Sequence, residues 1–216
     1  MIIDPENLTL EAILRHLPPA ANSVLEIGCG NGRLSSQLFE HVNRLTAVDP
    51  DRESLLSAKQ GSASIAFVLM SGEHLAFADD SFDAAVFTLS LHHQNSPAAL
   101  REAARVVRSR GIILVVEPAP DGEVEQLCNV FDDETEVLAR AMDAVESCGL
   151  SPGPREIIRP LWKCADGKAL IDWLFDHYNV PCEQSKADHI IRILGRRADD
   201  GPLLLQDKLR VISLRR

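Results

Sequence analysis

The chain has 216 residues and a formal net charge of −10 at pH 7. This length suits one α/β domain that buries a parallel sheet under helices on both faces, so we expect a single domain over residues 1–216. The acidic balance opposes non-specific binding to a phosphate backbone, which needs clustered lysine and arginine, and we expect no nucleic-acid partner. No apolar run approaches the roughly 18 residues that span a bilayer, so we expect no membrane partner either.

The first residues and the cysteines indicate the cellular compartment in which we expect the protein. Residues 1–5 show no basic segment ahead of an apolar one, so no secretory signal is predicted and we expect a cytoplasmic protein. The five cysteines are odd in number and form no C-x-x-C pair, so we expect reduced thiols, no disulfide framework and no metal site. The sequence leaves the oligomeric state open.

The first half of the chain predicts one amphipathic helix and then a regular alternation of strands and helices. Leucine or isoleucine recurs at helical spacing from Leu10 to Leu17, ahead of two prolines that end the helix. The segments that follow are, in chain order, a strand at 23–27, a helix at about 32–41, a strand at 44–49, a helix near 53–60, a strand at 65–70, a strand at 82–88, a helix at about 96–109 and a strand at 111–117. In the last helix, Ser96 is the expected N-cap and Pro97 the first helical residue. Such alternation predicts a parallel sheet that binds ligands at the carboxyl ends of its strands.

The second half predicts longer helices. A helical stretch follows Pro120, with Asp132 as a candidate restart of the helix, and ends at Gly149, the expected C-cap. Short strands near 156–159 and 208–214 then enclose two helical segments, at about 167–178 and 183–197. We therefore expect a core over about 20–150 and a helical, lid-like insertion at about 161–200 between the last two strands. Four aromatic residues of this insertion suit either a lid or a core, and their spacing is more typical of a core: Trp162, Trp173, Phe175 and Tyr178.

A glycine-rich loop follows the first strand of this alternation. Gly28, Gly30 and Gly32 have the spacing G-x-G-x-G immediately before a helix. The dinucleotide fingerprint G-x-G-x-x-G would place its third glycine at position 33, which is Arg33. Glycines let the backbone approach a ligand closely, and the start of the helix offers unpaired N–H groups to an anion such as a carboxylate. The alternative is a tight turn that binds nothing.

The next strand ends at Asp49, in the sequence Asp49-Pro50. A carboxylate there can accept hydrogen bonds from both hydroxyls of a ribose. The alternative is that Asp49 caps the helix that starts near Asp51, and the two roles are compatible. A glycine loop and an acid at these two strand ends together favour cofactor binding over a bare turn.

Six blocks of sequence, in their order and spacing, resemble the class I S-adenosylmethionine-dependent methyltransferases, and in particular the type-11 family. They are Val24–Arg33 (VLEIGCGNGR), Ala47–Pro50, Glu73–Phe77, Ser81–Asp83, Leu91–His93 and Arg105–Val107, and with their connections they span about residues 23–118. The resemblance implies an α/β, Rossmann-like, doubly wound fold with a mostly parallel seven-stranded sheet, helices on both faces and an antiparallel last strand. It also implies S-adenosylmethionine as the cofactor.

The resemblance implies a role for particular residues. Those expected to bind the cofactor are Glu26, Gly28, Gly30, Asn31 and Gly32 around its methionine portion, Asp49 on its ribose, Pro50, Gly72 and Glu73 around its adenine, and Leu89 beside it. Family members often place an acid where this chain has Ser71, a weaker and uncharged acceptor, so either adenine affinity falls or Glu73 substitutes. The usual Pro-Gly-Gly turn before the fifth strand reads Ser109-Arg110-Gly111.

Two histidines are the candidate catalytic residues. His92 and His93 follow the fourth strand at the predicted mouth of the site, where an imidazole can take a proton from an acceptor hydroxyl or amine. The alternative is a packed or capping role, because transfer from a sulfonium needs no base once the acceptor is aligned. Glu117, at the end of the fifth strand, is a weaker candidate.

The expected reaction is methyl transfer to a small-molecule acceptor by in-line displacement. Residues 88–91 lack the Pro-Pro-aromatic sequence of DNA amino-methyltransferases and the Pro-Cys nucleophile of cytosine-carbon enzymes, and no acid occupies the magnesium position of catechol-type enzymes. We expect an acceptor pocket formed by the N-terminal helix, His92, His93 and the segment between the last two strands. The alternatives are a non-catalytic methyltransferase-like subunit that binds S-adenosylmethionine or supports a partner protein, a nicotinamide oxidoreductase and an aminopropyl transferase.

Overall fold

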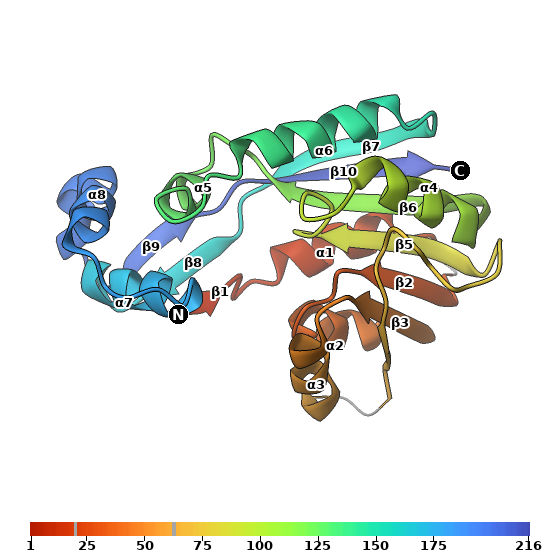
Figure 1. Ribbon diagram of the computed structural model, residues 1–216, viewed down its shortest axis with the longest axis horizontal. Coiled ribbons are helices and arrows are strands. Elements are labelled where there is room, and N and C mark those ends of the chain that lie inside the picture. The colour runs from red at the N-terminus through yellow and green to blue at the C-terminus, as the bar shows by residue number, and fades with distance from the viewer. Residues whose placement is uncertain (20, 62–63) are drawn as a thin grey trace. The chain divides into compact units, whose positions relative to one another are not determined.

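The computed structural model describes residues 1–19, 21–61 and 64–216, which form two compact units (Figure 1). The large unit consists of residues 10–117, 137–156 and 210–216, and the small unit of residues 1–9, 118–136 and 157–209. Among the described residues, no helix combines the length and the apolarity that a membrane crossing requires. The expected single-domain organisation stays a prediction.

The large unit contains a seven-stranded sheet. Its strands, in spatial order, are β4 (Ala66–Leu69), β3 (Arg44–Asp49), β2 (Ser23–Ile27), β5 (Phe82–Thr88), β6 (Val107–Pro118), β10 (Leu209–Arg215) and β7 (Ser151–Ile158). The first five strands of this order are parallel to their neighbours. Strand β10 is antiparallel to β6, because Arg216 at its end exchanges hydrogen bonds with Arg110 and Gly111 near the start of β6. The predicted Rossmann-like sheet with an antiparallel last strand is confirmed.

Helices cover both faces of this sheet. They are α1 (Leu8–His16), α2 (Arg33–Phe39), α3 (Arg52–Gly61), α4 (Ser96–Val106) and α6 (Thr135–Ser147). Alternate residues of a strand point to opposite faces, so Leu25 and Ile27 of β2 pack with residues of α4 and α6 in one buried cluster. Glu26 points to the other face, where Ser35 of α2 contacts it. Gly149 follows α6 with a φ of +76°, in keeping with the expected C-cap.

Two local predictions in the large unit are wrong. Asn95, not Ser96, is the N-cap of α4, because the Asn95 side chain accepts a hydrogen bond from Ala98 N at 3.2 Å. The Ser96 hydroxyl instead donates to Leu91 O at 3.0 Å. Helix α4 also ends at Val106 rather than near residue 109, because the backbone from Val107 onward is the beginning of β6.

The expected turn at residues 109–111 is a bulge within β6. Phe82 of β5 pairs with Val107, whereas Ala84 pairs with Ile112. Residues 108–111 of β6 therefore lie opposite the single residue Asp83 of β5, and the extra residues form the bulge. A Cβ atom at Gly111 would lie 2.4 Å from the Val107 side chain, which explains the retained glycine.

The small unit has its own sheet and its own core. The antiparallel strands β1 (Ile2–Ile3), β8 (Leu161–Cys164) and β9 (Leu203–Gln206) accompany helices α5 (Glu123–Cys128), α7 (Gly167–His177) and α8 (Gln184–Leu194) and a 3₁₀ helix at Gly195–Asp199. Leu170, Leu174 and Ile190 are at most 1% exposed, and Trp162, Trp173 and Tyr178 pack against the same cluster. The aromatic side chains thus belong to a core, whereas the three-stranded sheet was not predicted.

Candidate functional site

The predicted site residues gather at one edge of the large unit's sheet, where the parallel strands β2 to β5 end. The strand registers pair Ile27 of β2 with Val48 of β3 and with Phe87 of β5. Asp49, the next residue of β3, pairs with Leu69 of β4. The loops that follow these four strands therefore lie next to one another, and together they form what we call the carboxyl edge.

Glu26 places a buried carboxyl group beneath this edge, 2% exposed. The Ser35 hydroxyl donates a hydrogen bond to Glu26 Oε2 at 2.5 Å. Burial raises the pKa of Glu26 to about 7, and the negative charge of Asp49 acts in the same direction, against the opposing effects of Ser35 and Arg33. A cationic amine bound nearby would favour the ionised form, so its binding would release a proton.

The glycine loop after β2 is closely packed at both ends, at Gly28 and at Gly32, and open in the middle. Gly28, Gly30 and Gly32 all have positive φ angles, between 51° and 79°, which glycine adopts without steric cost. A Cβ atom at Gly28 would lie 2.4 Å from the Ser90 Cβ, whereas one at Gly30 would meet no described atom within 4 Å. The backbone of Gly30 thus borders open space that a ligand can enter. Asn31 turns back to accept a hydrogen bond from Arg33 N at 3.3 Å.

Asp49 holds this loop from the end of β3. Its Oδ2 accepts a hydrogen bond from Gly30 N at 2.7 Å, and its Oδ1 accepts one from Asp51 N at 2.8 Å. The cap of α3 is Asp51, whose carboxylate accepts from Ser54 N at 2.9 Å. Each oxygen of the Asp49 carboxylate has a second lone pair that can accept a ligand hydroxyl. Pro50, the next residue, is exposed.

The loop after β4 forms the expected adenine side. A Cβ atom at Gly72 would lie 2.2 Å from Gln94 Oε1, so this glycine allows close contact with the loop after β5. The Ser71 hydroxyl accepts a hydrogen bond from Glu73 N at 3.3 Å. One oxygen of Glu73 accepts from Asn95 N at 2.7 Å and ties the loop to the start of α4.

The β5–α4 loop, residues 89–95, is anchored on both sides. Leu89 N donates to Val116 O of β6 at 2.8 Å, and the Ser90 hydroxyl donates to Ile27 O of β2 at 2.7 Å. Leu89 itself has a φ of +53° and is 37% exposed, so it can contact a ligand.

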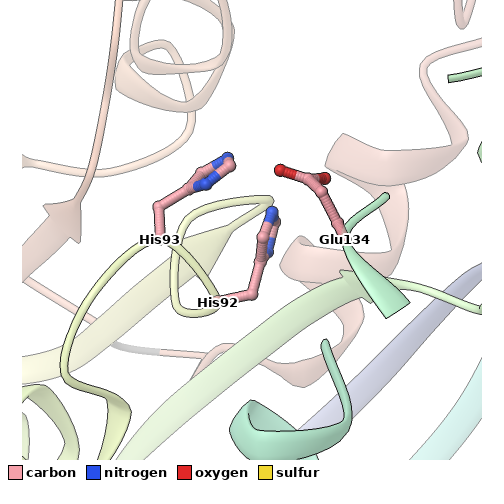
Figure 2. A group of neighbouring side chains, drawn as sticks. All are labelled: His92, His93 and Glu134. Carbon is pink, nitrogen blue, oxygen red and sulfur yellow. The ribbon is translucent and has the colours of Figure 1, made fainter. Parts of the chain in front are cut away.

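His92 and His93 lie at the centre of this loop. Figure 2 shows their two imidazole rings next to each other, with ring centroids 3.9 Å apart. His92 is buried and His93 is exposed. His92 Nδ1 is hydrogen-bonded to Glu117 Oε2, and Leu91 N donates to Glu117 Oε1 at 2.8 Å. The weakest of the predicted candidates, Glu117, is thus a direct partner of His92.

A cavity of about 510 Å³ lies beside His92 within the large unit. Its walls come from the end of the β5–α4 loop, the first turn of α4 and one face of α6, which includes Arg140 and Asp143. Gln94 lines the cavity and also borders Gly72. The cavity is therefore adjacent to the carboxyl edge.

Sequence reasoning missed the residues that support the site. Ser35, Ser90 and Gln94 hold Glu26, Ile27 and the β5–α4 loop in place. Ser35 occurs on the buried side of α2, where a polar residue needs a partner. The place of Ser35 in the helical pattern could have indicated a buried polar contact, but the sequence does not identify Glu26 as its partner.

The chemistry of the carboxyl edge fits the expected cofactor. S-adenosylmethionine carries an amine, a carboxylate and a ribose with two hydroxyls. Glu26 offers a buried carboxyl group for a cation, and Asp49 offers lone pairs for hydroxyls. Open space at Gly30 admits the ligand to the loop.

Comparisons with known proteins agree with this geometry. Residues 25–115 match a family model described as a methyltransferase domain. An uncharacterised methyltransferase of Mycobacterium tuberculosis is 35% identical over 101 residues, which are 47% of this chain and 42% of that protein. A malonyl-[acyl-carrier protein] O-methyltransferase of Erwinia pyrifoliae is 35% identical over 106 residues, 48% of this chain and 40% of that protein.

Among solved structures, the YcgJ protein of Bacillus subtilis has the same fold, with a TM-score of 0.70 and 21% identity over 96% of this chain and 97% of that chain. The chain spans about two-fifths of the length of the two curated relatives just described. Residues 25–115, less than half of the chain, are thus similar to the methyltransferase domains of the type-11 family, and this similarity supports S-adenosylmethionine as the cofactor.

Proposed function

We propose that the whole protein is an S-adenosylmethionine-dependent methyltransferase that acts on a small-molecule acceptor. The observation that carries the proposal is the contact between Gly30 N and Asp49 Oδ2 at 2.7 Å, which joins the glycine loop to the acid of the next strand. A tight turn without a ligand does not require a carboxylate at this point. This contact between Gly30 and Asp49 supports a single cofactor site that is formed by the glycine loop and the acid together.

The binding roles follow from position along the carboxyl edge. Glu26 and the loop of Gly28, Gly30 and Gly32 bind the methionine portion, with Asn31 in the same turn. Asp49 accepts the ribose hydroxyls. The residues proposed to border the adenine and the rest of the cofactor are Pro50, Gly72, Glu73 and Leu89.

The reaction is an in-line displacement. Bound S-adenosylmethionine supplies a methyl carbon that is already electrophilic, because it is attached to a sulfonium. The acceptor atom attacks this carbon, the carbon–sulfur bond breaks, and its electron pair stays on sulfur. The protein's task is to hold the acceptor about 3 to 3.5 Å from the methyl carbon and to exclude water.

His92 or His93 takes the proton of an acceptor that is not already deprotonated. His92 is the better placed of the two, since it lines the cavity of about 510 Å³ next to the carboxyl edge. We propose that the acceptor enters this cavity. Replacement of both histidines by alanine with no change in the rate of methyl transfer would remove the general base from the proposal.

Calorimetry with S-adenosylmethionine, S-adenosylhomocysteine and NADH tests the cofactor. We expect micromolar binding of the two sulfur ligands and none of NADH. In Asp49→Ala both affinities should fall about 10- to 100-fold, because hydrogen bonds to a charged group contribute about 1.5–3 kcal/mol. Asp51→Ala is the matched control, because it removes the cap of α3. The cap contributes roughly 1 kcal/mol to the stability of the helix and makes no ligand contact in the proposal, so both affinities should change less than about threefold.

The outcomes separate the alternatives. Binding of NADH alone would replace the methyltransferase by an oxidoreductase, and binding of no ligand would refute the cofactor assignment. Tight binding of S-adenosylmethionine with no turnover on any acceptor would favour the non-catalytic subunit.

A further inference from the structure

Glu117 is a charged residue in the interior of the large unit, with no exposed surface. A carboxylate in such a position is unfavourable unless hydrogen bonds compensate it. Two groups do so, and both belong to the β5–α4 loop: Leu91 N donates to Oε1 at 2.8 Å, and His92 Nδ1 is bonded to Oε2. A single side chain of β6 therefore holds both the backbone and the imidazole of this loop.

The parallel pairing of β5 and β6 brings these groups together. Thr88, the last residue of β5, pairs with Val116, so Glu117 is the next residue along the carboxyl edge. Leu89 N donates to Val116 O immediately before the loop turns. Because these contacts come from the sheet register, they fix the loop independently of any ligand.

The contact with Glu117 also selects one form of the imidazole. A carboxylate accepts a proton and has none to give, so neutral His92 carries its hydrogen on Nδ1. The lone pair that can take a further proton is then on Nε2. A carboxylate bonded to one nitrogen also stabilises the imidazolium that forms when the other nitrogen is protonated.

We infer that Glu117 is a positioning residue, which holds His92 with its hydrogen on Nδ1 so that Nε2 accepts the proton of the acceptor. The inference rests on the proposed function, because it needs methyl transfer at this site. It also narrows the acceptor class to a protic nucleophile, that is, a hydroxyl or an amine that bears hydrogen. During transfer the acceptor atom forms its bond to the methyl carbon as the carbon–sulfur bond breaks and leaves its electron pair on sulfur, and the acceptor's proton passes to Nε2.

The ring nitrogens can be observed without an acceptor. Protein labelled with ¹⁵N-histidine is examined by proton–nitrogen correlation spectroscopy at a pH where His92 is neutral, with His92→Gln used to assign its signals. We expect Nδ1 of His92 to show the shift of a protonated nitrogen and Nε2 that of an unprotonated one. Glu117→Gln should weaken or reverse this preference, because an amide can also donate a hydrogen bond to Nδ1.

Glu102→Gln provides the matched control, since Glu102 is a glutamate of α4 in the same unit whose carboxylate accepts hydrogen bonds from Leu75 N and Arg105. It should leave the His92 signals unchanged. A wild-type spectrum with the hydrogen on Nε2, or one that Glu117→Gln does not alter, would overturn the inference. Melting temperatures of all variants identify any that fail to fold, and the less disruptive Glu117→Asp then supplies the spectrum.

The kinetic test uses a panel of small phenols and primary amines and measures release of S-adenosylhomocysteine. For any acceptor that is methylated, Glu117→Gln should lower kcat about 10- to 100-fold and change KM and cofactor affinity less than about threefold. Unchanged kcat, or a loss confined to KM, would contradict the positioning role. Absence of S-adenosylmethionine binding in the wild type would instead refute the proposed function, whatever the tautomer of His92.

Discussion

The glycine loop after β2 and the β5–α4 loop lie next to each other on the carboxyl edge, but they are stabilised in different ways. The first depends on backbone conformation and on Asp49, 19 residues from Gly30. The second depends on the Glu117 side chain of β6, 25 residues from His92, and on the backbone oxygens of Ile27 and Val116 in its two neighbouring strands. Each loop thus depends on a carboxylate from a neighbouring strand, but the glycine loop also depends on positive φ angles, whereas the loop of the proposed proton acceptor is held by several separate hydrogen bonds to β2 and β6.

This difference explains which features a sequence motif can reveal. G-x-G-x-G followed by Asp49 describes nearly all of the first loop, because positive φ angles and one carboxylate define it. No comparable pattern describes the second loop, since its geometry comes from the register of β5 and β6. The two loops meet at Gly28 and Ser90, and the contact between them can be tested directly.

The largest expected effect is that of Gly28→Ala. A methyl group there would lie 2.4 Å from the Ser90 Cβ, at a φ of +79° that only glycine adopts readily. Overpacking and left-handed strain together should lower the free energy of unfolding by about 3 kcal/mol and should also abolish cofactor binding. Chemical denaturation with and without S-adenosylmethionine measures both effects.

Gly30→Ala is the natural comparison, because Gly30 also has a positive φ but an added Cβ would meet no described atom within 4 Å. Backbone strain alone should lower stability by about 1 kcal/mol. If the two variants lost equal free energy of unfolding, the contact between the loops would be unimportant. Backbone conformation alone would then account for the stability that each glycine contributes.

The next largest effect concerns Glu26 and pH. Burial raises its pKa to about 7 in the folded protein from an ordinary value of 4.5, so the folded state binds the proton more tightly than the unfolded state does. The contribution of Glu26 to stability is therefore largest at low pH and is lost as the pH rises from about 4.5 to about 7. The loss should reach about 3 kcal/mol relative to Glu26→Gln, whose side chain does not ionise.

Cofactor binding should reverse this trend, because the cofactor amine favours ionised Glu26. The affinity of the wild type should then increase as the pH rises from 6 to 8, and that of Glu26→Gln should vary much less. Parallel pH profiles for the two proteins, measured by calorimetry, would contradict a role for Glu26 in binding the amine.

The sequence allowed most of the large unit to be predicted, for identifiable physical reasons. The bounds of β2, β3 and β5 match the expected strands because buried parallel strands are continuous apolar runs between loops. The strands of the small unit were missed: β1 has two residues and β8 and β9 have four each, too few to show a period. Long-range pairing of β8 with β9, across the intervening helices, leaves no local pattern.

In the candidate site, too, features with a local sequence pattern were predicted, and a contact that depends on strand pairing was not. The glycines and Asp49 were identified from spacing, and their contact is present. The link between Glu117 and His92 was not predicted, because it requires knowledge that Val116 and Thr88 are opposite each other in the sheet. The cap of α4 was assigned one residue too late, since Asn95 and Ser96 are both good N-caps and only tertiary contact of the Ser96 hydroxyl with Leu91 O distinguishes them.

The smallest expected effect tests that cap, at the end of the second loop. Asn95→Ala removes the hydrogen bond to Ala98 N and should lower the free energy of unfolding by about 1 kcal/mol. Asn95→Asp keeps an oxygen acceptor at the helix start and should retain the stability. The Asn95 backbone N–H that binds Glu73 is unaffected in both variants, so cofactor affinity should change less than about threefold, in line with a cap worth roughly 1 kcal/mol. A large loss of affinity in Asn95→Ala would mean that the start of α4 takes part in cofactor binding, and the separation between the two loops would then be less complete than their contacts indicate.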